Sequence, residues 1–253
     1  MSKIALITGA TAGIGEAVAY TLAKEGFDLI ITGRRASLLT TLSGELERGF
    51  DIRTLPLAFD VRDVSQVEHY LANLPAEWSG VELLINNAGL AVGLNPIDRG
   101  VLDDWERMID TNIKGLLYVT RVISSGMVER GSGHIINIGS IAGKSVYLNG
   151  NVYCATKFAV DALSKGMMMD LNEKGIKVSQ VCPGAVETEF SKVRFKGDEE
   201  KAANVYRGFE PLTAADVAEM VRYIVMAPEH VNISEVVIMP KAQASPNMIR
   251  REP

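Results

Sequence analysis

The chain has 253 residues, 47% of them hydrophobic, and a formal net charge of −5. That length suffices for one well-buried core, and the negative charge argues against binding to nucleic acid or to an anionic membrane surface. No apolar run approaches the ~20 residues that span a bilayer, and a strand-like run already begins at residue 4, so we expect no signal peptide and a cytoplasmic protein. The two cysteines and three histidines show no metal-ligand spacing, so we expect no metal site.

Hydrophobic runs alternate with helix-period segments from one end of the chain to the other. The strand-like runs are short, β-branched and almost continuously apolar, which is typical of strands buried on both faces. We expect strands at Ile4–Thr8, Asp28–Thr32, Arg53–Ala58, Leu83–Asn86, His134–Ile138, Lys177–Val181 and Glu235–Ile238. We expect helices around 14–25, 36–48, 64–73, 104–130, 152–173 and 214–226. This alternation predicts a single α/β domain over 1–253, a Rossmann fold whose doubly wound parallel sheet of about seven strands has helices on both faces.

Two segments depart from this alternation. The stretch at 190–211 is polar and mixed in charge, so we expect either a lid-like insertion over the sheet edge or a surface excursion. The residues after about 240 follow the last predicted strand and form a C-terminal extension.

The first predicted strand leads into the sequence T-G-A-T-A-G-I-G at 8–15, and a predicted helix follows. Gly9, Gly13 and Gly15 permit a tight turn and let the backbone approach a phosphate, which the amides at the helix N-terminus then face. The spacing of these glycines differs from the common G-x-G-x-x-G. The interpretation as a phosphate-binding loop therefore depends on the position of the segment between the first predicted strand and the first predicted helix. The alternative is a turn that needs glycine for packing only.

The end of the second predicted strand should select between the two nicotinamide cofactors. An acidic residue there, ~20 residues past the glycines, would hold the ribose 2′-hydroxyl of NAD. Arg34 and Arg35 occupy this place, and two guanidinium groups can bind the 2′-phosphate of NADP. The alternative is a solvated pair of charges, although cations are unfavourable at a helix N-terminus.

Ser140, Tyr153 and Lys157, later in the chain, form a set that suggests proton transfer. Tyr153 and Lys157 are four positions apart in a predicted helix and therefore share one face. An isolated tyrosine has a pKa near ~10, and a nearby ammonium stabilises the phenolate and lowers that pKa. Taken alone, the Y-x-x-x-K pattern is common on surface helices. Ser140 follows a predicted strand at the carboxyl-end edge, where parallel sheets bind ligands, and its alternative role is a helix cap or turn serine.

Together these motifs resemble the short-chain dehydrogenase/reductase family over essentially the whole chain. The matching pieces, in order, are the glycine segment 8–15, N-N-A-G at 86–89, Asn112 in D-T-N, the residues Ser140, Tyr153 and Lys157, and Pro183-Gly184. The resemblance implies an enzyme in which Tyr153 is the general acid in reduction and the base in oxidation. It also implies that Lys157 lowers the pKa of Tyr153 and holds the nicotinamide ribose, and that Ser140 binds the reacting oxygen. Asn112 would hold a water that links Lys157 to solvent.

The same resemblance implies the cofactor contacts. Asp60 would contact the adenine, Asn87 and Gly89 would lie along the adenosine ribose, and Thr188 would bind the nicotinamide carboxamide. The full set of expected cofactor residues is Gly9, Thr11, Gly13, Ile14, Gly15, Arg34, Arg35, Asp60, Val61, Asn87, Ala88, Gly89, Tyr153, Lys157, Pro183, Gly184, Val186 and Thr188.

A finer resemblance points to one subgroup, the NADP-dependent 3-hydroxy acid dehydrogenases. It rests on the segments 86–94, 110–115, 133–139, 192–198 and 230–240. It implies oxidation of the 3-hydroxyl of small acids such as serine, L-allo-threonine or 3-hydroxyisobutyrate by a homotetramer. The alternatives are a 3-oxoacyl carrier-protein reductase or broad carbonyl reductase with the same catalytic residues, and an NADP-binding regulatory protein without activity.

A substrate carboxylate needs a cationic partner, because burying an unpaired charge is costly. Lys192, Arg194 and Lys196 are the cations nearest in sequence after Thr188. Arg194 is the first choice, since a guanidinium matches a carboxylate bidentately. The alternative is that all three are solvated charges or subunit contacts.

Overall fold

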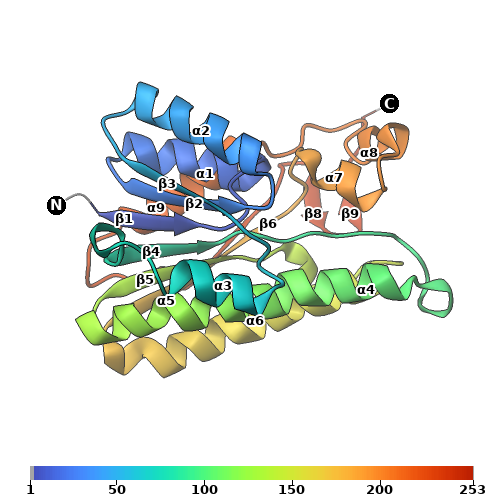
Figure 1. Ribbon diagram of the computed structural model, residues 1–253. Helices are drawn as coiled ribbons and strands as arrows, with labels where there is room; N and C mark the ends of the chain where they lie inside the picture. The colour runs from blue at the N-terminus through green and yellow to red at the C-terminus, as the bar shows by residue number, and fades with distance from the viewer. Residues whose placement is uncertain (1–2, 253) are drawn as a thin grey trace.

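The computed structural model of the protein describes residues 3–252, and in this part of the chain seven parallel strands form one sheet (Figure 1). The strand order is β3-β2-β1-β4-β5-β6-β7, so the sheet is doubly wound about β1 and β4, as the sequence predicts. The strands are β1 (Ile4–Ile7), β2 (Asp28–Gly33), β3 (Thr54–Ala58), β4 (Val81–Asn86), β5 (Gly133–Ile138), β6 (Ile176–Pro183) and β7 (Glu235–Ile238). The order changes direction between β1 and β4, which is where such folds bind ligands.

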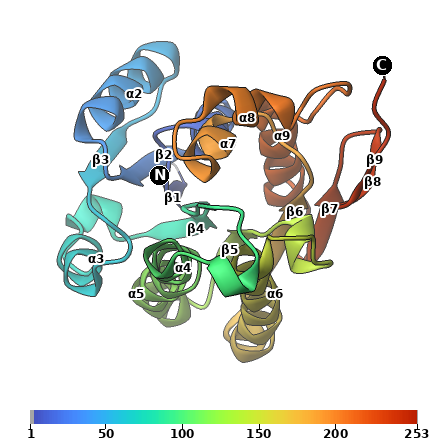
Figure 2. The same ribbon diagram turned by 90° about the vertical axis from the view of Figure 1, so that its right-hand side faces the viewer.

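Helices cover both faces of the sheet, as the end-on view makes clear (Figure 2). One layer contains α1 (Gly13–Lys24), α2 (Ala36–Gly49) and α9 (Ala214–Val225). The other contains α3 (Val64–Leu71), α4 (Leu102–Ile109), α5 (Leu116–Arg130) and α6 (Asn151–Leu171). Successive strand residues face opposite layers: Ile7 packs in the cluster with α1 and α9, and Leu6 in the cluster with α3 and α5. Two apolar cores, one on each face, therefore hold the sheet between the helices.

The edge strands differ from the expected pattern. We predicted all seven strands to be buried on both faces, but β3 and β7 contain only half-buried and exposed residues. Each has a single neighbouring strand in the sheet, so helices and strands cover it less completely than the five central strands.

The region 104–130, predicted as one helix, is divided. Between α4 and α5 lies a turn of wider π-helical geometry, η3 (Asp110–Gly115). Such bulges are frequent at functional sites, and this one contains Asn112. Buried residues recur at helical spacing on both sides of this segment, so the periodicity of the sequence does not reveal the wider turn.

The polar stretch after β6 also contains helices that the sequence did not predict. Its residues form α7 (Glu189–Arg194) and α8 (Glu199–Asn204), which lie above the carboxyl end of the sheet (Figure 1). The extension after residue 240 forms a small hairpin, β8 (Gln243–Ser245) with β9 (Met248–Ile249). Within residues 3–252, no helix is both long enough and apolar enough to cross a membrane.

Candidate active site

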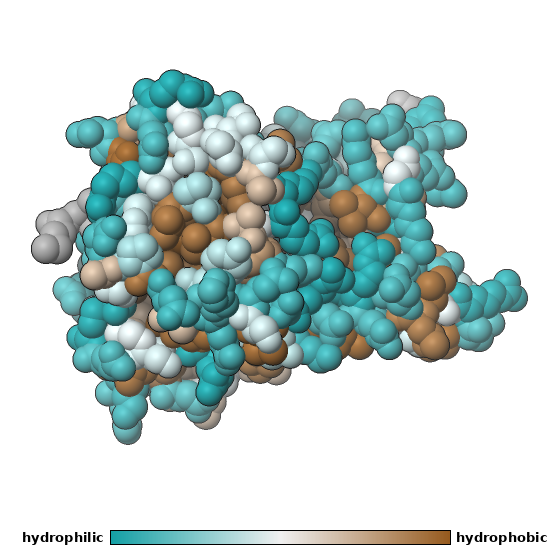
Figure 3. Space-filling view, in the orientation of Figure 1, coloured by the Kyte–Doolittle hydropathy of each residue, from teal (hydrophilic) through white to brown (hydrophobic). Residues whose placement is uncertain are grey.

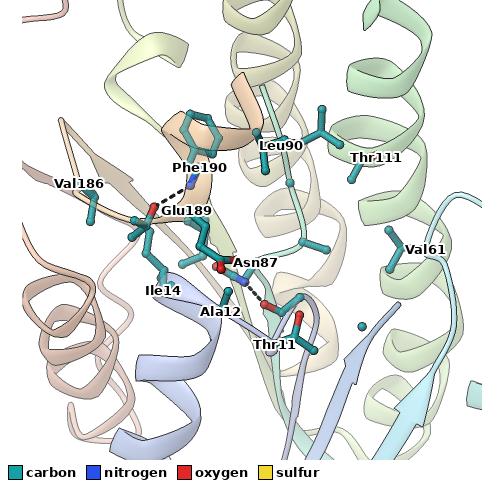
Figure 4. A pocket seen from close by; sticks show the side chains of 18 of the residues that line it. Thr11, Ala12, Ile14, Val61, Asn87, Leu90, Thr111, Val186, Glu189 and Phe190 are labelled. Atoms are coloured by element: carbon teal, nitrogen blue, oxygen red, sulfur yellow. Dashed lines mark hydrogen bonds between the residues drawn. The ribbon is translucent and has the colours of Figure 1, made fainter. Parts of the chain in front are cut away.

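A cleft of about 380 Å³ opens at the carboxyl end of the sheet, between the β1–α1 loop, the loops after β4 and β5, and α7 (Figure 4). Its volume lies in the range of small-molecule and cofactor sites. The expected site residues line this cleft with three exceptions, which are Gly15, Asn112 and Arg194. Most of the expected site residues therefore lie in one place. Gly15 and Asn112 are buried, and Arg194 contacts the rings of Tyr153 and Phe190, which line the cleft.

The glycine-rich loop is built for close approach. Gly9 and Gly13 have φ values of +67° and +58°, in the left-handed region that favours glycine. The loop is tied to the segment after β4, because Asn87 Nδ2 donates to Thr8 O at 2.9 Å and to Gly9 O at 3.1 Å. Gly15 has a packing role, since a Cβ there would lie 2.3 Å from Gly9 O.

The two arginines after β2 differ in their surroundings. Arg34 is exposed and lines the cleft. Arg35 instead binds Thr11: Nε and Nη2 donate to its Oγ1 at 3.2 and 3.0 Å, and Nη2 also donates to its carbonyl oxygen at 3.1 Å. Its Nη1 forms an ion pair with Glu189 of α7 at 3.2 Å. The sequence suggested two equivalent guanidinium groups, but within residues 3–252 such partners are seen for Arg35 and not for Arg34.

Asp60 is held at the end of β3 by its neighbour. Arg62 donates from Nε and Nη2 to the two carboxylate oxygens, with Nη2 to Oδ2 at 2.6 Å. Burial raises the pKa of Asp60, but the hydrogen bonds and charge of Arg62 outweigh this and lower it. The carboxylate is therefore ionised and fixed in place at the edge of the cleft.

Ser140, Tyr153 and Lys157 meet at the inner end of the cleft. Ser140 hydrogen-bonds to the hydroxyl of Tyr153, and its Oγ also accepts the Ala142 amide at 3.1 Å. It is therefore both a turn cap and a member of the cluster. Lys157 is only 7% exposed and its Nζ donates to Ile138 O at 2.9 Å. Burial lowers the pKa of Lys157 to about 8.

The environment of Tyr153 differs from the expectation in one respect. Burial raises the pKa of its hydroxyl, and the charge of Arg194 and the hydrogen bond from Ser140 oppose that increase. The expected influence was that of Lys157, which in this structure binds the Ile138 carbonyl. Arg194 therefore supplies the cation that acts on the tyrosine.

Asn112 lies behind the cleft and holds two elements together. Its Oδ1 accepts the Leu90 amide, and its Nδ2 donates to the Leu90 carbonyl, both at 2.9 Å. Nδ2 also donates to Thr156 Oγ1 on α6 at 3.0 Å. The side chain thus fixes the loop after β4 against the helix that carries Tyr153 and Lys157.

Arg194 ends α7 in a box of aromatic rings. Its guanidinium carbon lies 5.0 Å from the ring centre of Tyr153, 5.4 Å from Tyr147 and 5.5 Å from Phe190. Nη2 donates to the Tyr147 hydroxyl. Nε is buried without a hydrogen-bond partner among the described residues. A buried, unpaired donor beside the tyrosine can accept an anionic partner at little further desolvation cost.

Sequence reasoning missed several residues of the site. Glu189, Phe190 and Leu90 line the cleft, and Tyr147 supports Arg194. Phe190 packs edge-on against Tyr153 at 5.7 Å between ring centres, and Glu189 points from α7 into the cleft (Figure 4). The one available signal was that Glu189 and Phe190 directly follow Thr188. None of the four belongs to a motif with a recognised spacing.

The doubly wound sheet, the glycine loop at its switch point and the Ser–Tyr–Lys cluster define a dinucleotide-binding oxidoreductase. The sequence profile of the short chain dehydrogenase family matches residues 3–199, and the chain belongs to that family. It is 48% identical over 242 residues to the NADP-dependent 3-hydroxy acid dehydrogenase YdfG of Salmonella typhi, covering 95% of this chain and 96% of that protein. It is 43% identical over 244 residues to the serine 3-dehydrogenase of Rhizobium radiobacter, with 96% of each chain covered.

A solved structure agrees with these relatives. The closed form of serine dehydrogenase complexed with NADP+ matches with a TM-score of 0.91 and 46% identity, over 98% of this chain and all of that one. The predicted fold and family are thereby confirmed.

Proposed function

We propose that the protein transfers a hydride between NADP and the 3-hydroxyl carbon of small hydroxy acids such as serine, L-allo-threonine or 3-hydroxyisobutyrate. The observation that carries this proposal is Arg194, a half-buried cation whose guanidinium carbon lies 5.0 Å from the ring centre of the tyrosine that transfers the proton. The names of the relatives, NADP-dependent 3-hydroxy acid dehydrogenase and serine 3-dehydrogenase, support the same substrate class.

The cleft suits a dinucleotide phosphorylated on its ribose. The left-handed glycines leave backbone amides near the N-terminus of α1 without side chains above them, which favours a pyrophosphate. The exposed guanidinium of Arg34 at the end of β2 favours a 2′-phosphate. NADP, when bound, supplies or accepts the hydride. The residues that would hold it are the expected cofactor residues that line the cleft. Among them are Gly9, Thr11, Asp60, Val61, Asn87–Gly89, Pro183, Gly184, Val186 and Thr188.

Three side chains would manage the proton. In reduction, the Tyr153 hydroxyl donates a proton to the carbonyl oxygen, and in oxidation the phenolate removes one from the alcohol. Ser140 donates a hydrogen bond to the same oxygen and orients it. Lys157 lines the same cleft and is ionised below its pKa of about 8, so it adds a second positive charge to the site besides that of Arg194.

Arg194 would bind the substrate carboxylate together with Tyr147. Burial raises the pKa of the Tyr147 hydroxyl well above its usual value, so the hydroxyl remains protonated at neutral pH. It accepts a hydrogen bond from Arg194, so its own O–H remains available as a donor. A carboxylate would thus meet a charged and a neutral donor side by side.

The experiment that tests this function is a substrate panel with NADP+ and NADPH. We expect turnover of free serine, L-allo-threonine or 3-hydroxyisobutyrate, because these carry the carboxylate beside the reacting carbon. Turnover confined to a thioester-linked 3-oxoacyl chain would contradict the proposal and indicate a carrier-protein reductase. Cofactor binding without turnover of any member would indicate a regulatory protein.

We also propose a cytoplasmic homotetramer. Exposed apolar side chains occur on the α4–α6 layer, among them Leu102, Leu117, Phe158 and Met169. The face of the molecule in Figure 3 shows several hydrophobic patches among hydrophilic residues. A second group lies along α9, β7 and the C-terminal hairpin: Tyr223, Met226, Val237, Met239 and Met248. Two separate apolar surfaces favour closed assembly about two axes, and a monomer in light scattering would contradict it. The unpaired Cys154 and Cys182 are compatible with a reducing compartment.

A further inference from the structure

We propose that Glu189 competes with the cofactor's 2′-phosphate for Arg35 and thereby sets the affinity for NADP and the rate at which it leaves. This inference rests on the proposed function, in which the residues after β2 bind a 2′-phosphate. The observation behind it is the ion pair between Arg35 Nη1 and Glu189 at 3.2 Å, which joins the end of β2 to the first residue of α7.

The hydrogen bonds of Arg35 leave one edge of the guanidinium for an outside anion. Nε and Nη2 are directed at Thr11 on the glycine loop, through its hydroxyl and its carbonyl oxygen. Nη1 is the remaining nitrogen, and Glu189 binds it. A phosphate that approaches Arg35 from the cleft therefore needs the nitrogen that the carboxylate holds. Nη1 carries two N–H groups, but a carboxylate and a phosphate bound to the same nitrogen would repel each other, so the two anions compete for it.

The charges around the pair favour exchange over permanent pairing. The pKa of Glu16 is raised, first by burial and then by the negative charges of Glu45 and Glu189, and the positive charge of Arg35 opposes this. Glu16 therefore lies close enough to Glu189 and Arg35 to interact with both. Arg35 thus faces more than one carboxylate, and each of them repels an incoming phosphate. The pair is also well exposed, at 46% for the arginine and 58% for the glutamate side chain. Exposed pairs of this kind are weak, so a dianionic phosphate can displace the carboxylate.

The consequence distinguishes the two nicotinamide cofactors. NADP has to displace Glu189 from Arg35, whereas NAD has no 2′-phosphate and leaves the ion pair intact. When NADP leaves, the carboxylate returns to the guanidinium and favours dissociation. Glu189 is therefore a specificity-determining residue that moderates NADP binding, located on the same six-residue helix that ends in Arg194.

The test is the Glu189→Gln variant, with cofactor binding measured directly by fluorescence titration and stopped-flow displacement. We expect NADP+ to bind about three- to fivefold more tightly and NADPH to dissociate correspondingly more slowly, because an exposed ion pair that must be broken has been removed. The Kd for NAD+ should stay unchanged. Glu187→Gln is the matched control, since it removes the same charge two residues earlier, where the side chain is also exposed.

Two outcomes would overturn the inference. Equal changes in Kd for NADP+ and NAD+ would mean that Glu189 acts through the shape of α7. Weaker NADP+ binding would mean that the carboxylate orients Arg35 toward the phosphate.

A double-mutant cycle separates this inference from the assignment beneath it. In an Arg35→Ala background, Glu189→Gln should leave the Kd for NADP+ unchanged, because the guanidinium for which the anions compete is gone. If Arg35→Ala alone leaves NADP+ affinity intact, the role of Arg35 as a phosphate contact is wrong. If Arg35→Ala weakens NADP+ binding but Glu189→Gln alone has no effect, Arg35 does bind the phosphate and only the proposed competition with Glu189 is wrong. These assays need no hydroxy acid, so they stand apart from the substrate assignment.

Discussion

Replacing Tyr153 with phenylalanine should lower kcat by about 10³-fold or more while the fold and NADPH binding persist, since a positioned general acid contributes roughly 10²–10⁴-fold. The change removes a single oxygen from a residue that is 9% exposed and keeps the ring that packs against Phe190 and Arg194. What is lost is the proton that the carbonyl oxygen requires. The measurement is steady-state turnover, with NADPH titration and circular dichroism as checks on binding and folding.

Tyr20→Phe provides the matched control. Tyr20 lies on α1, where its hydroxyl donates to Glu45, far from the proton-transfer cluster in the sequence and outside the cleft lining. This variant should keep a normal kcat. A Tyr153→Phe enzyme with near-normal kcat would refute the proton-transfer role, whichever substrate is used.

Replacing Arg194 with alanine should raise KM for serine or 3-hydroxyisobutyrate by more than about tenfold, equivalent to ~1.4 kcal/mol of binding free energy. The guanidinium has a buried Nε without a partner among the described residues, and its removal leaves a substrate carboxylate with Tyr147 alone. Reduction of an uncharged ketone at neutral pH should be nearly unchanged, because Tyr153 is protonated there in both enzymes. The comparison of the two substrates by steady-state kinetics checks the assignment.

The same variant should alter the pH dependence of alcohol oxidation. Arg194 is a cation that lowers the pKa of Tyr153 against the effect of burial, so its removal raises that pKa. Oxidation requires the phenolate, and the acidic limb of kcat/KM should therefore move to higher pH. Lys192→Ala is the control, since Lys192 is an exposed cation on the same helix that pairs with Glu199. Equal losses with both substrates would show that Arg194 shapes α7 and does not bind the carboxylate.

Short-range patterns were sufficient to predict the fold and most of the cleft. Alternating apolar runs and helix-period segments determine a parallel sheet because each element must bury one surface on the next. Once the sheet is parallel, residues that follow its strands meet at one edge, which is why Gly9, Asn87 and Ser140 line the same cleft although they lie far apart in the chain. These conclusions depend only on residue type and order.

The tertiary structure decided which groups touch one another. The sequence could not show that Thr11 and Glu189 bind Arg35 and not Arg34, because the two arginines are adjacent and chemically identical. It could not show that Arg194, rather than Lys157, places a cation over Tyr153, since α7 reaches the tyrosine by a path that no periodicity encodes. Pairing of charged side chains depends on distances of a few ångströms across separate elements, and those distances are set by packing. The sequence by itself therefore determined the chemistry that this protein performs, and the packing of α7 against the cleft decided which side chains control it.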